Sequence, residues 1–166
     1  RKVRKIKSWK YINKDTKDDI YIELWGKKIG RKGNENNNKI IDLCLSGKPK
    51  EALLYFNNIY DNSISNIGIV RQFRNQLKLI ENLILLNKKG LNLRDAINKI
   101  KPPIFFKNIP TVTAQCKIWS LKKVAATQKN LIKLEINCKT STYPEKTLIS
   151  QFILSTSLLA IKKTKF

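Results

Sequence analysis

Apolar residues recur every three or four positions along most of this chain, a spacing that places them on one side of an α-helix. The pattern starts near residue 40 and continues to residue 161. The longest example covers residues 64–89, with apolar residues at Ile64, Ile67, Val70, Phe73, Leu77, Ile80 and Ile84. After residue 36 the sequence lacks the alternation typical of a β-hairpin. The pattern therefore predicts an all-α fold.

Glycines, prolines and capping residues divide this region into separate helices. Glycine favours the end of a helix, and Ser or Asn caps its first turn. Proline has no backbone N–H to donate a hydrogen bond inside a helix, so it interrupts one. The divisions fall at Gly47 and Pro49, Gly90, Asn92, Pro102 and Pro103, Ser120, and Pro144. They predict a bundle of about six or seven helices. In the last helix, the pattern assigns Leu148, Phe152, Ser155 and Leu159 to one side.

Residues 1–36 differ from the rest of the chain. They hold 12 basic and 5 acidic side chains and two of the three Trp residues. Residues 1–10 favour a basic amphipathic helix, residues 20–24 alternate weakly like a strand, and the glycines and asparagines of 30–38 are typical of a linker. We expect a basic segment without a defined fold over residues 1–36 and a helical domain over residues 37–166. Because Arg1 occupies the first position and the sequence contains no Met, we expect a fragment of a longer protein.

The net charge is +22, and the sequence pI is about 10.1. Such a charge favours a polyanionic partner. The abundance of Lys, Ile and Asn weakens this inference. All three have codons rich in A and T, so an A- and T-rich genome would raise the lysine content without selection for a basic surface. Arg71 and Arg74 lie three residues apart on the polar side of the long helix, where they form either a solvated surface or a phosphate contact. A basic helical module that binds nucleic acid is therefore the alternative prediction.

The sequence contains little that could support catalysis. It has no His, so a Ser–His or Cys–His pair is excluded within these residues, and the acidic residues after residue 36 occur singly. Cys44, Cys116 and Cys138 match neither a zinc spacing nor a disulfide framework, and we interpret them as small buried apolar residues. A phosphate-binding glycine loop is also absent from the sequence. We expect a non-catalytic chain with no cofactor and no metal.

The remaining sequence features concern location and aromatic residues. No apolar run reaches the ~18 residues needed to cross a membrane, which predicts a cytoplasmic protein without a membrane partner. Phe105 and Phe106 follow a pair of prolines and are interpreted as a hydrophobic plug that packs the connector onto the bundle. Trp119 is interpreted as a core residue. Stacking of these rings on nucleic-acid bases is the alternative.

The order of several short motifs resembles the C-terminal domain of the delta subunit of bacterial DNA polymerase III, in particular its alphaproteobacterial version. The resemblance covers residues 37 to about 162. Its motifs are Asp42-Leu43-Cys44-Leu45-Ser46-Gly47, Arg71-Gln72-Phe73-Arg74, Pro102-Pro103-Ile104-Phe105-Phe106-Lys107, Gln115, Trp119-Ser120, Cys138-Lys139-Thr140 and Pro144. The family often has Gly in the turn after the last tripeptide, where this chain has Thr142.

The resemblance implies a part in the clamp loader, which places the sliding clamp on primed DNA during replication. This domain forms the helical collar that holds delta in a ring with the gamma/tau and delta-prime subunits. The clamp contact belongs to an AAA+-like domain before Arg1, so the chain would reach primed DNA only indirectly. Delta is a non-hydrolysing subunit of a nucleotidyltransferase holoenzyme, and residues 1–36 occupy the place of the end of its lid domain. The resemblance makes seven residues candidates for the subunit interface or the collar core: Arg71, Arg74, Phe105, Phe106, Gln115, Trp119 and Lys139.

Overall fold

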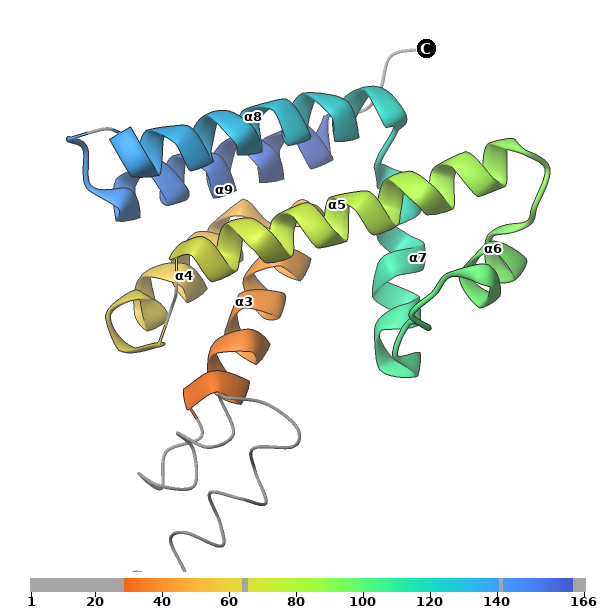
Figure 1. Ribbon diagram of the computed structural model, residues 1–166, viewed down its shortest axis with the longest axis horizontal. Coiled ribbons are helices and arrows are strands. Elements are labelled where there is room, and N and C mark those ends of the chain that lie inside the picture. Colours follow the sequence, from red (N-terminus) through yellow and green to blue (C-terminus); the bar gives the residue numbers. More distant parts are fainter. Residues whose placement is uncertain (1–28, 64–65, 141, 163–166) are drawn as a thin grey trace, which may run out of the picture.

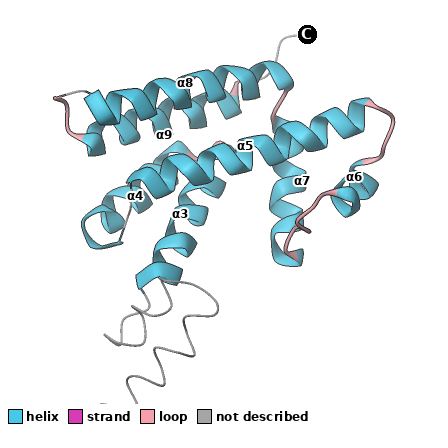
Figure 2. Cartoon of the chain, viewed as in Figure 1, coloured by secondary structure: helices cyan, strands magenta, loops and turns pink. Residues whose placement is uncertain are grey.

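The computed structural model describes residues 29–63, 66–140 and 142–162. Within these ranges the chain forms seven α-helices, one 3-10 helix and no strand (Figures 1 and 2). The elements are α3 (Ile29–Leu45), α4 (Pro49–Ser63), α5 (Asn66–Lys88), α6 (Leu93–Lys99), η1 (Phe106–Asn108), α7 (Ile109–Ile118), α8 (Leu121–Thr140) and α9 (Glu145–Ile161). The predicted all-α bundle of six or seven helices is confirmed.

The longest helix, α5, runs across the middle of the molecule (Figure 1). Helices α8 and α9 pack against each other as a hairpin, with α8 on α5 and α9 on α3 and α4. Helices α6 and α7 contact α5 near its carboxyl end, where they form a separate arm. The described residues therefore comprise a five-helix bundle and a smaller helical arm that share α5.

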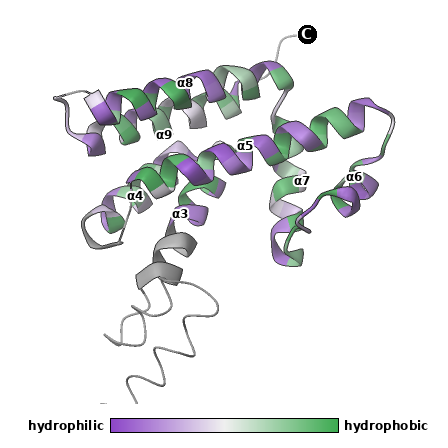
Figure 3. Cartoon of the chain, in the orientation of Figure 1, coloured by the Kyte–Doolittle hydropathy of each residue, from purple (hydrophilic) through white to green (hydrophobic). Residues whose placement is uncertain are grey.

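Two groups of buried side chains stabilise this arrangement. The larger lies inside the five-helix bundle and contains Phe56, Phe73, Leu77 and Ile153, all without solvent exposure. The smaller lies between α5 and the arm and consists of Leu83, Ala96, Ile97 and Val112. Figure 3 shows hydrophobic and hydrophilic residues alternating along α5 and α8. Because α5 contributes to both groups, it joins the arm to the bundle.

The helix ends confirm several predictions from the sequence. Gly47 and Gly90 have φ angles of +73° and +91°, a left-handed conformation that glycine adopts without steric strain. The Asn92 side chain accepts a hydrogen bond of 2.8 Å from the Asp95 backbone N–H at the start of α6. The Ser120 hydroxyl accepts one of 3.4 Å from the Lys123 N–H at the start of α8. Local residue chemistry therefore sets these boundaries.

The linker prediction for residues 30–38 is wrong, because α3 begins at Ile29 and runs through this segment. Glycines and asparagines are weak helix formers, but Ile40, Ile41 and Cys44 anchor the same helix in the core. The predicted helix at 1–10 and strand at 20–24 lie outside the described residues. The division of the chain after residue 36 stays a prediction.

The apolar faces predicted for two helices also need correction. Ile67 on α5 is 69% exposed. On α9, Ser155 is exposed, and the buried side consists of Ile149, Phe152, Ile153, Thr156, Ser157 and Ala160. Because α9 is apolar on several sides, its sequence alone does not define which side is covered. Of the helices described, none is both long and apolar enough for a membrane span.

Candidate functional site

The seven candidate residues lie in three places rather than in one site. The first place is buried, the second is an exposed aromatic pair, and the third is a hollow lined by charged residues. Gln115 and Trp119 are inside the molecule, Phe105 and Phe106 are in the connector before α7, and Arg71, Arg74 and Lys139 surround a hollow between α5 and α8.

Gln115 lies at a buried junction of three helices. It is fully buried, and its Oε1 accepts a hydrogen bond of 2.8 Å from Gln76 Nε2 on α5. Its Nε2 donates one of 3.2 Å to Asp42 Oδ1 on α3. A buried amide is costly unless both of its ends are satisfied, and here both are. This side chain therefore holds α3, α5 and α7 in register.

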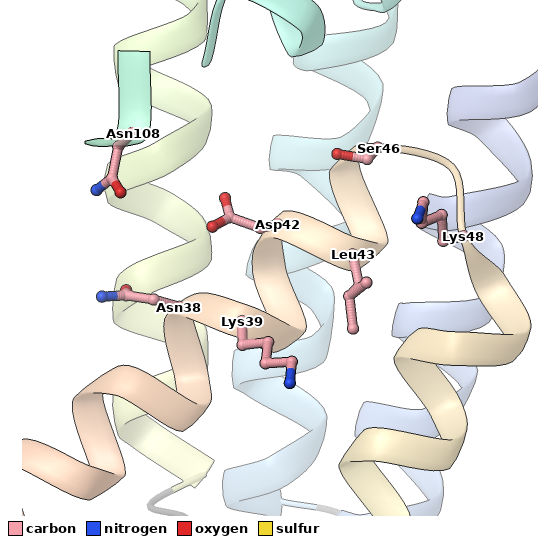
Figure 4. Close-up of a pocket in the computed structure, with 7 residues that line it drawn as sticks. All are labelled: Asn38, Lys39, Asp42, Leu43, Ser46, Lys48 and Asn108. Carbon is pink, nitrogen blue, oxygen red and sulfur yellow. The ribbon is translucent and has the colours of Figure 1, made fainter. Parts of the chain in front are cut away.

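Asp42 also lines an open pocket of about 410 Å³ between α3 and the connector. Figure 4 shows its carboxylate between Asn38 and Asn108, with Lys39 pointing away. The Lys39 ammonium instead lies 4.4 Å from the centroid of the Tyr55 ring. Burial raises the pKa of Asp42 above its ordinary value of 3.8, against a smaller lowering by the Gln115 hydrogen bond. The arrangement is a hydrogen-bonded junction with a carboxylate that is costly to ionise.

We expect Asp42→Asn to stabilise the chain at about pH 7 and to have little effect at about pH 3.5. A carboxyl whose pKa is raised in the folded state stabilises it below the unfolded pKa, and this stability is lost as the pH rises through the folded pKa. Asn stays neutral, and its Oδ1 can still accept the bond from Gln115. Urea unfolding of both proteins at the two pH values should show a difference that grows with pH. A difference independent of pH would contradict the expectation.

We expect Gln115→Leu to lower the free energy of unfolding by roughly 1–3 kcal/mol, because it leaves the Gln76 amide and the Asp42 carboxylate without their partner. Leucine has a similar volume, so the loss reports mainly on hydrogen bonding. Denaturant unfolding measures it. Gln151→Leu, at an exposed position of α9, is the matched control and should change stability by less than about 0.5 kcal/mol. Equal effects of the two changes would count against the junction.

Trp119 is buried where α7 meets α8, as the sequence predicts. Its Nε1 donates a hydrogen bond of 2.8 Å to the Leu45 carbonyl at the end of α3. That carbonyl is one of the four at a helix end that lack a partner within the helix. Trp119 therefore fills core volume and caps a distant helix at the same time.

Lys123 has a structural role that the sequence pattern does not indicate. Lys122 and Lys123 are adjacent in the sequence, and such a basic pair is typical of a solvated or phosphate-binding surface, but the Lys123 side chain is buried. Its Nζ donates to the Ile118 carbonyl at 3.3 Å and to the Lys162 carbonyl at 2.5 Å. Both carbonyls lie at helix carboxyl ends, where a cation is favourable. No spacing rule on α8 identifies this contact, because Lys162 is distant in sequence.

Phe105 and Phe106 do not pack as a hydrophobic plug, and that interpretation is wrong. The two side chains are 58% and 67% exposed, and their ring centroids lie 4.7 Å apart. Ile104 instead packs against the smaller buried group. The ammonium of Lys107 is 5.9 Å from the Phe106 ring centroid. As candidates for contact with another macromolecule the two rings stay a prediction.

Arg71, Arg74 and Lys139 line a hollow of about 330 Å³ between α5, α8 and the start of α9. Glu135 accepts hydrogen bonds from Arg74 and, at 3.1 Å, from Lys139. The bond from Lys139 and the neighbouring Arg74 lower the pKa of the Glu135 carboxyl. Among the residues described, no acidic side chain pairs with Arg71. A second carboxylate in the lining, Glu145, accepts a hydrogen bond from Asn66, so the hollow has three cations against two carboxylates.

Cys138 lies in the wall of the same hollow, and all three cysteines are free thiols. Burial raises the pKa of the Cys44 thiol to about 12 and that of Cys116 to about 11. Cys44 is fully buried, as predicted, whereas Cys116 and Cys138 are only partly buried. Across the described ranges, no cluster of three or more Cys, Asp or Glu side chains could hold a metal ion.

Comparisons with known proteins give one consistent result. The profile of the family described as DNA polymerase III delta subunit, C-terminal domain, matches residues 34–156. Among solved structures, the Bacillus subtilis DNA clamp loader delta protein superposes with a TM-score of 0.61 at 16% sequence identity. The match covers 82% of this chain and 39% of the Bacillus chain, so this chain spans well under half of that protein. No curated protein matches the sequence. Because the family profile matches most of its length, the chain belongs to the family formed by the C-terminal domains of DNA polymerase III delta subunits.

Proposed function

We propose that this chain is the collar portion of a clamp-loader delta subunit and that it binds the gamma/tau and delta-prime subunits. The family match over residues 34–156 is the observation on which the proposal depends. The fold supports it, because an all-α bundle presents helix faces against which other subunits can pack. Several large apolar side chains are also left exposed, including Ile67, Ile132, Ile136 and Leu158.

Clamp binding, DNA contact and nucleotide transfer would belong to parts of the assembly outside this chain. Contact with the sliding clamp would be made by a domain outside these residues, and primed DNA would be reached through the ring. Nucleotide transfer would belong to the polymerase subunits of the holoenzyme. Residues 1–36 would correspond to the end of a lid domain, and the motifs at 102–107 and 138–140 suggest the alphaproteobacterial type. We place the protein in the cytoplasm, where replication proceeds.

Size-exclusion chromatography of the chain mixed with gamma/tau and delta-prime from the same organism tests this function. We expect a joint complex that survives about 0.5 M salt, because apolar contacts are not screened by ions. Binding of primed DNA that weakens steeply with salt, without any binding to the two proteins, would instead support the nucleic-acid module. A chain that stays apart from both subunits would overturn the proposal.

A further inference from the structure

Helices α5 and α8 lie side by side in opposite directions, and together they form one outward surface (Figure 1). Arg74 pairs with Glu135, and Gln128 donates a hydrogen bond of 2.9 Å to Glu81. Both contacts lie on the side of α8 that borders α5. Residues three or four apart in a helix are neighbours on its surface, and Ile132 is four residues after Gln128 and three before Glu135. Ile132 therefore lies beside these two contacts, at the border with α5.

This surface exposes apolar side chains that nothing in the described structure covers. Ile132 and Ile136 are one turn apart on α8 and are 55% and 53% exposed. Ile67 is 69% exposed at the amino end of α5. We call this surface the α5–α8 face and define it by Ile67, Arg71, Lys78, Lys129, Ile132 and Ile136. Isoleucine is a costly residue to expose in adjacent turns unless another molecule covers it.

Most of the charged side chains around these isoleucines are positive. Six of the cations on α5 and α8 lie at or beside this face: Arg71, Arg74, Lys78, Lys129, Lys133 and Lys139. The only acidic residues in either helix are Glu81 and Glu135, and both already accept hydrogen bonds within the chain. A complementary partner must therefore bring negative charge to the edges of an apolar contact.

The hollow of about 330 Å³ lies at one end of the face. Ile67, Val70 and Cys138 supply apolar wall, while Arg71, Arg74 and Lys139 supply positive charge at the rim. The two carboxylates in the lining, Glu135 and Glu145, already accept hydrogen bonds within the chain. A concave apolar site with a charged rim suits one anchoring side chain flanked by carboxylates. The hollow and the paired isoleucines thus call for the same partner chemistry.

We propose that the α5–α8 face binds an amphipathic helix of a neighbouring clamp-loader protein, with an apolar stripe bordered by Asp and Glu and one apolar side chain inserted in the hollow. This inference rests on the proposed function. A second copy of the chain fits poorly, because its own face carries the same positive charge. A polynucleotide fits poorly too, because its phosphates would leave Ile132 and Ile136 uncovered.

Isothermal titration of the full chain with the gamma/tau–delta-prime mixture tests the face directly. We expect the double variant Ile132→Asp/Ile136→Asp to weaken binding at least about 30-fold, since apolar anchors dominate interface affinity. The matched control is Leu54→Asp on α4, because Leu54 is also 55% exposed but lies outside the face. It should bind as the wild type does. Circular dichroism should show the same helix content in all three proteins.

Charge reversal tests the second half of the proposal. Lys78→Glu/Lys129→Glu should weaken binding about tenfold or more at low salt and less at high salt. Lys50→Glu/Lys99→Glu makes the same change of charge at exposed positions away from the face and should bind as the wild type does. Equal losses in the two double variants would show a general charge effect and overturn the assigned face.

Alkylation of Cys138 gives a readout that does not depend on variants. Bound partner should slow its reaction with iodoacetamide at least about tenfold, as followed by peptide mass spectrometry. Cys44, fully buried with a raised pKa, should stay unreacted in both states. An unchanged Cys138 rate in the complex would overturn the inference.

The outcomes separate this inference from the proposed function. If the wild type binds the subunits and the isoleucine variant binds equally well, the face is wrong and the collar function stands. If the wild type binds neither of them, both proposals fail. If the lysine variant instead loses affinity for a fluorescein-labelled primed DNA while binding to gamma/tau and delta-prime is unchanged, the face is a nucleic-acid surface and the inference is overturned.

Discussion

Trp119→Ala should lower the free energy of unfolding by roughly 3–5 kcal/mol, the range found when a buried aromatic ring is removed from a packed core. Trp119 packs inside the larger core, and its Nε1 donates a hydrogen bond to the Leu45 carbonyl. The substitution therefore leaves a cavity and an unpaired helix-end carbonyl together. Equilibrium unfolding in urea, followed by circular dichroism at 222 nm, measures the loss.

Phe106→Ala is the matched control for Trp119→Ala. It also removes an aromatic ring, but Phe106 is exposed and makes its described ring contact with Phe105. We expect a change of less than about 1 kcal/mol. Trp119→Phe should fall between the two, because it retains an aromatic ring and loses the donor. Similar losses for Trp119→Ala and Phe106→Ala would contradict the burial described for these residues.

Phe73→Ala should be equally severe, with a loss of roughly 3–5 kcal/mol. Phe73 lies without solvent exposure in the middle of α5, and its ring meets that of Phe152 on α9 edge to face, with centroids 5.1 Å apart. Removing it opens a cavity where α5 and α9 are joined. The same urea titration measures the effect, and a lower midpoint with an unchanged slope is expected.

Ile67→Ala, on the same helix, is the control for Phe73→Ala. Because Ile67 is exposed, its loss should change stability by no more than about 0.5 kcal/mol. A double change of Phe73→Leu and Phe152→Leu should add a coupling of about 0.5–1.5 kcal/mol, the usual strength of an aromatic pair. A loss for Ile67→Ala as large as that for Phe73→Ala would contradict the orientation of α5.

The positions of these substitutions show which residues the sequence pattern placed correctly. The apolar spacing identified α5 and its inward residues Phe73, Leu77 and Ile80 correctly, because a long helix with polar residues on one side has one way to bury the other. The same spacing places Ile67 on the apolar side, but Ile67 is 69% exposed, although its neighbour Asn66 hydrogen-bonds to Tyr60 on α4 and Glu145 on α9. Periodicity identifies the apolar side of a helix, whereas the burial of each residue depends on which side chains of the neighbouring helices cover it.

The candidate site shows the same division. Trp119 was expected in the core and lies there, but Phe105 and Phe106 were expected to pack and are exposed. Gln115 was chosen from a family resemblance, and only the tertiary structure shows that it bridges Asp42 and Gln76. An aromatic pair beside two prolines is apolar in either orientation. Its burial therefore depends on whether a neighbouring surface is present.

The sequence by itself determined the helix content, the positions where Gly47, Gly90, Asn92 and Ser120 end or begin helices, and the family. Those properties depend on local backbone preferences and on the order of motifs, both of which are written in neighbouring residues. The tertiary structure alone decided which side of α9 is covered, why Lys123 is buried, and that Ile132 and Ile136 share a basic surface with α5. Each of these depends on contacts between residues that are far apart in the chain, and no local pattern encodes such contacts.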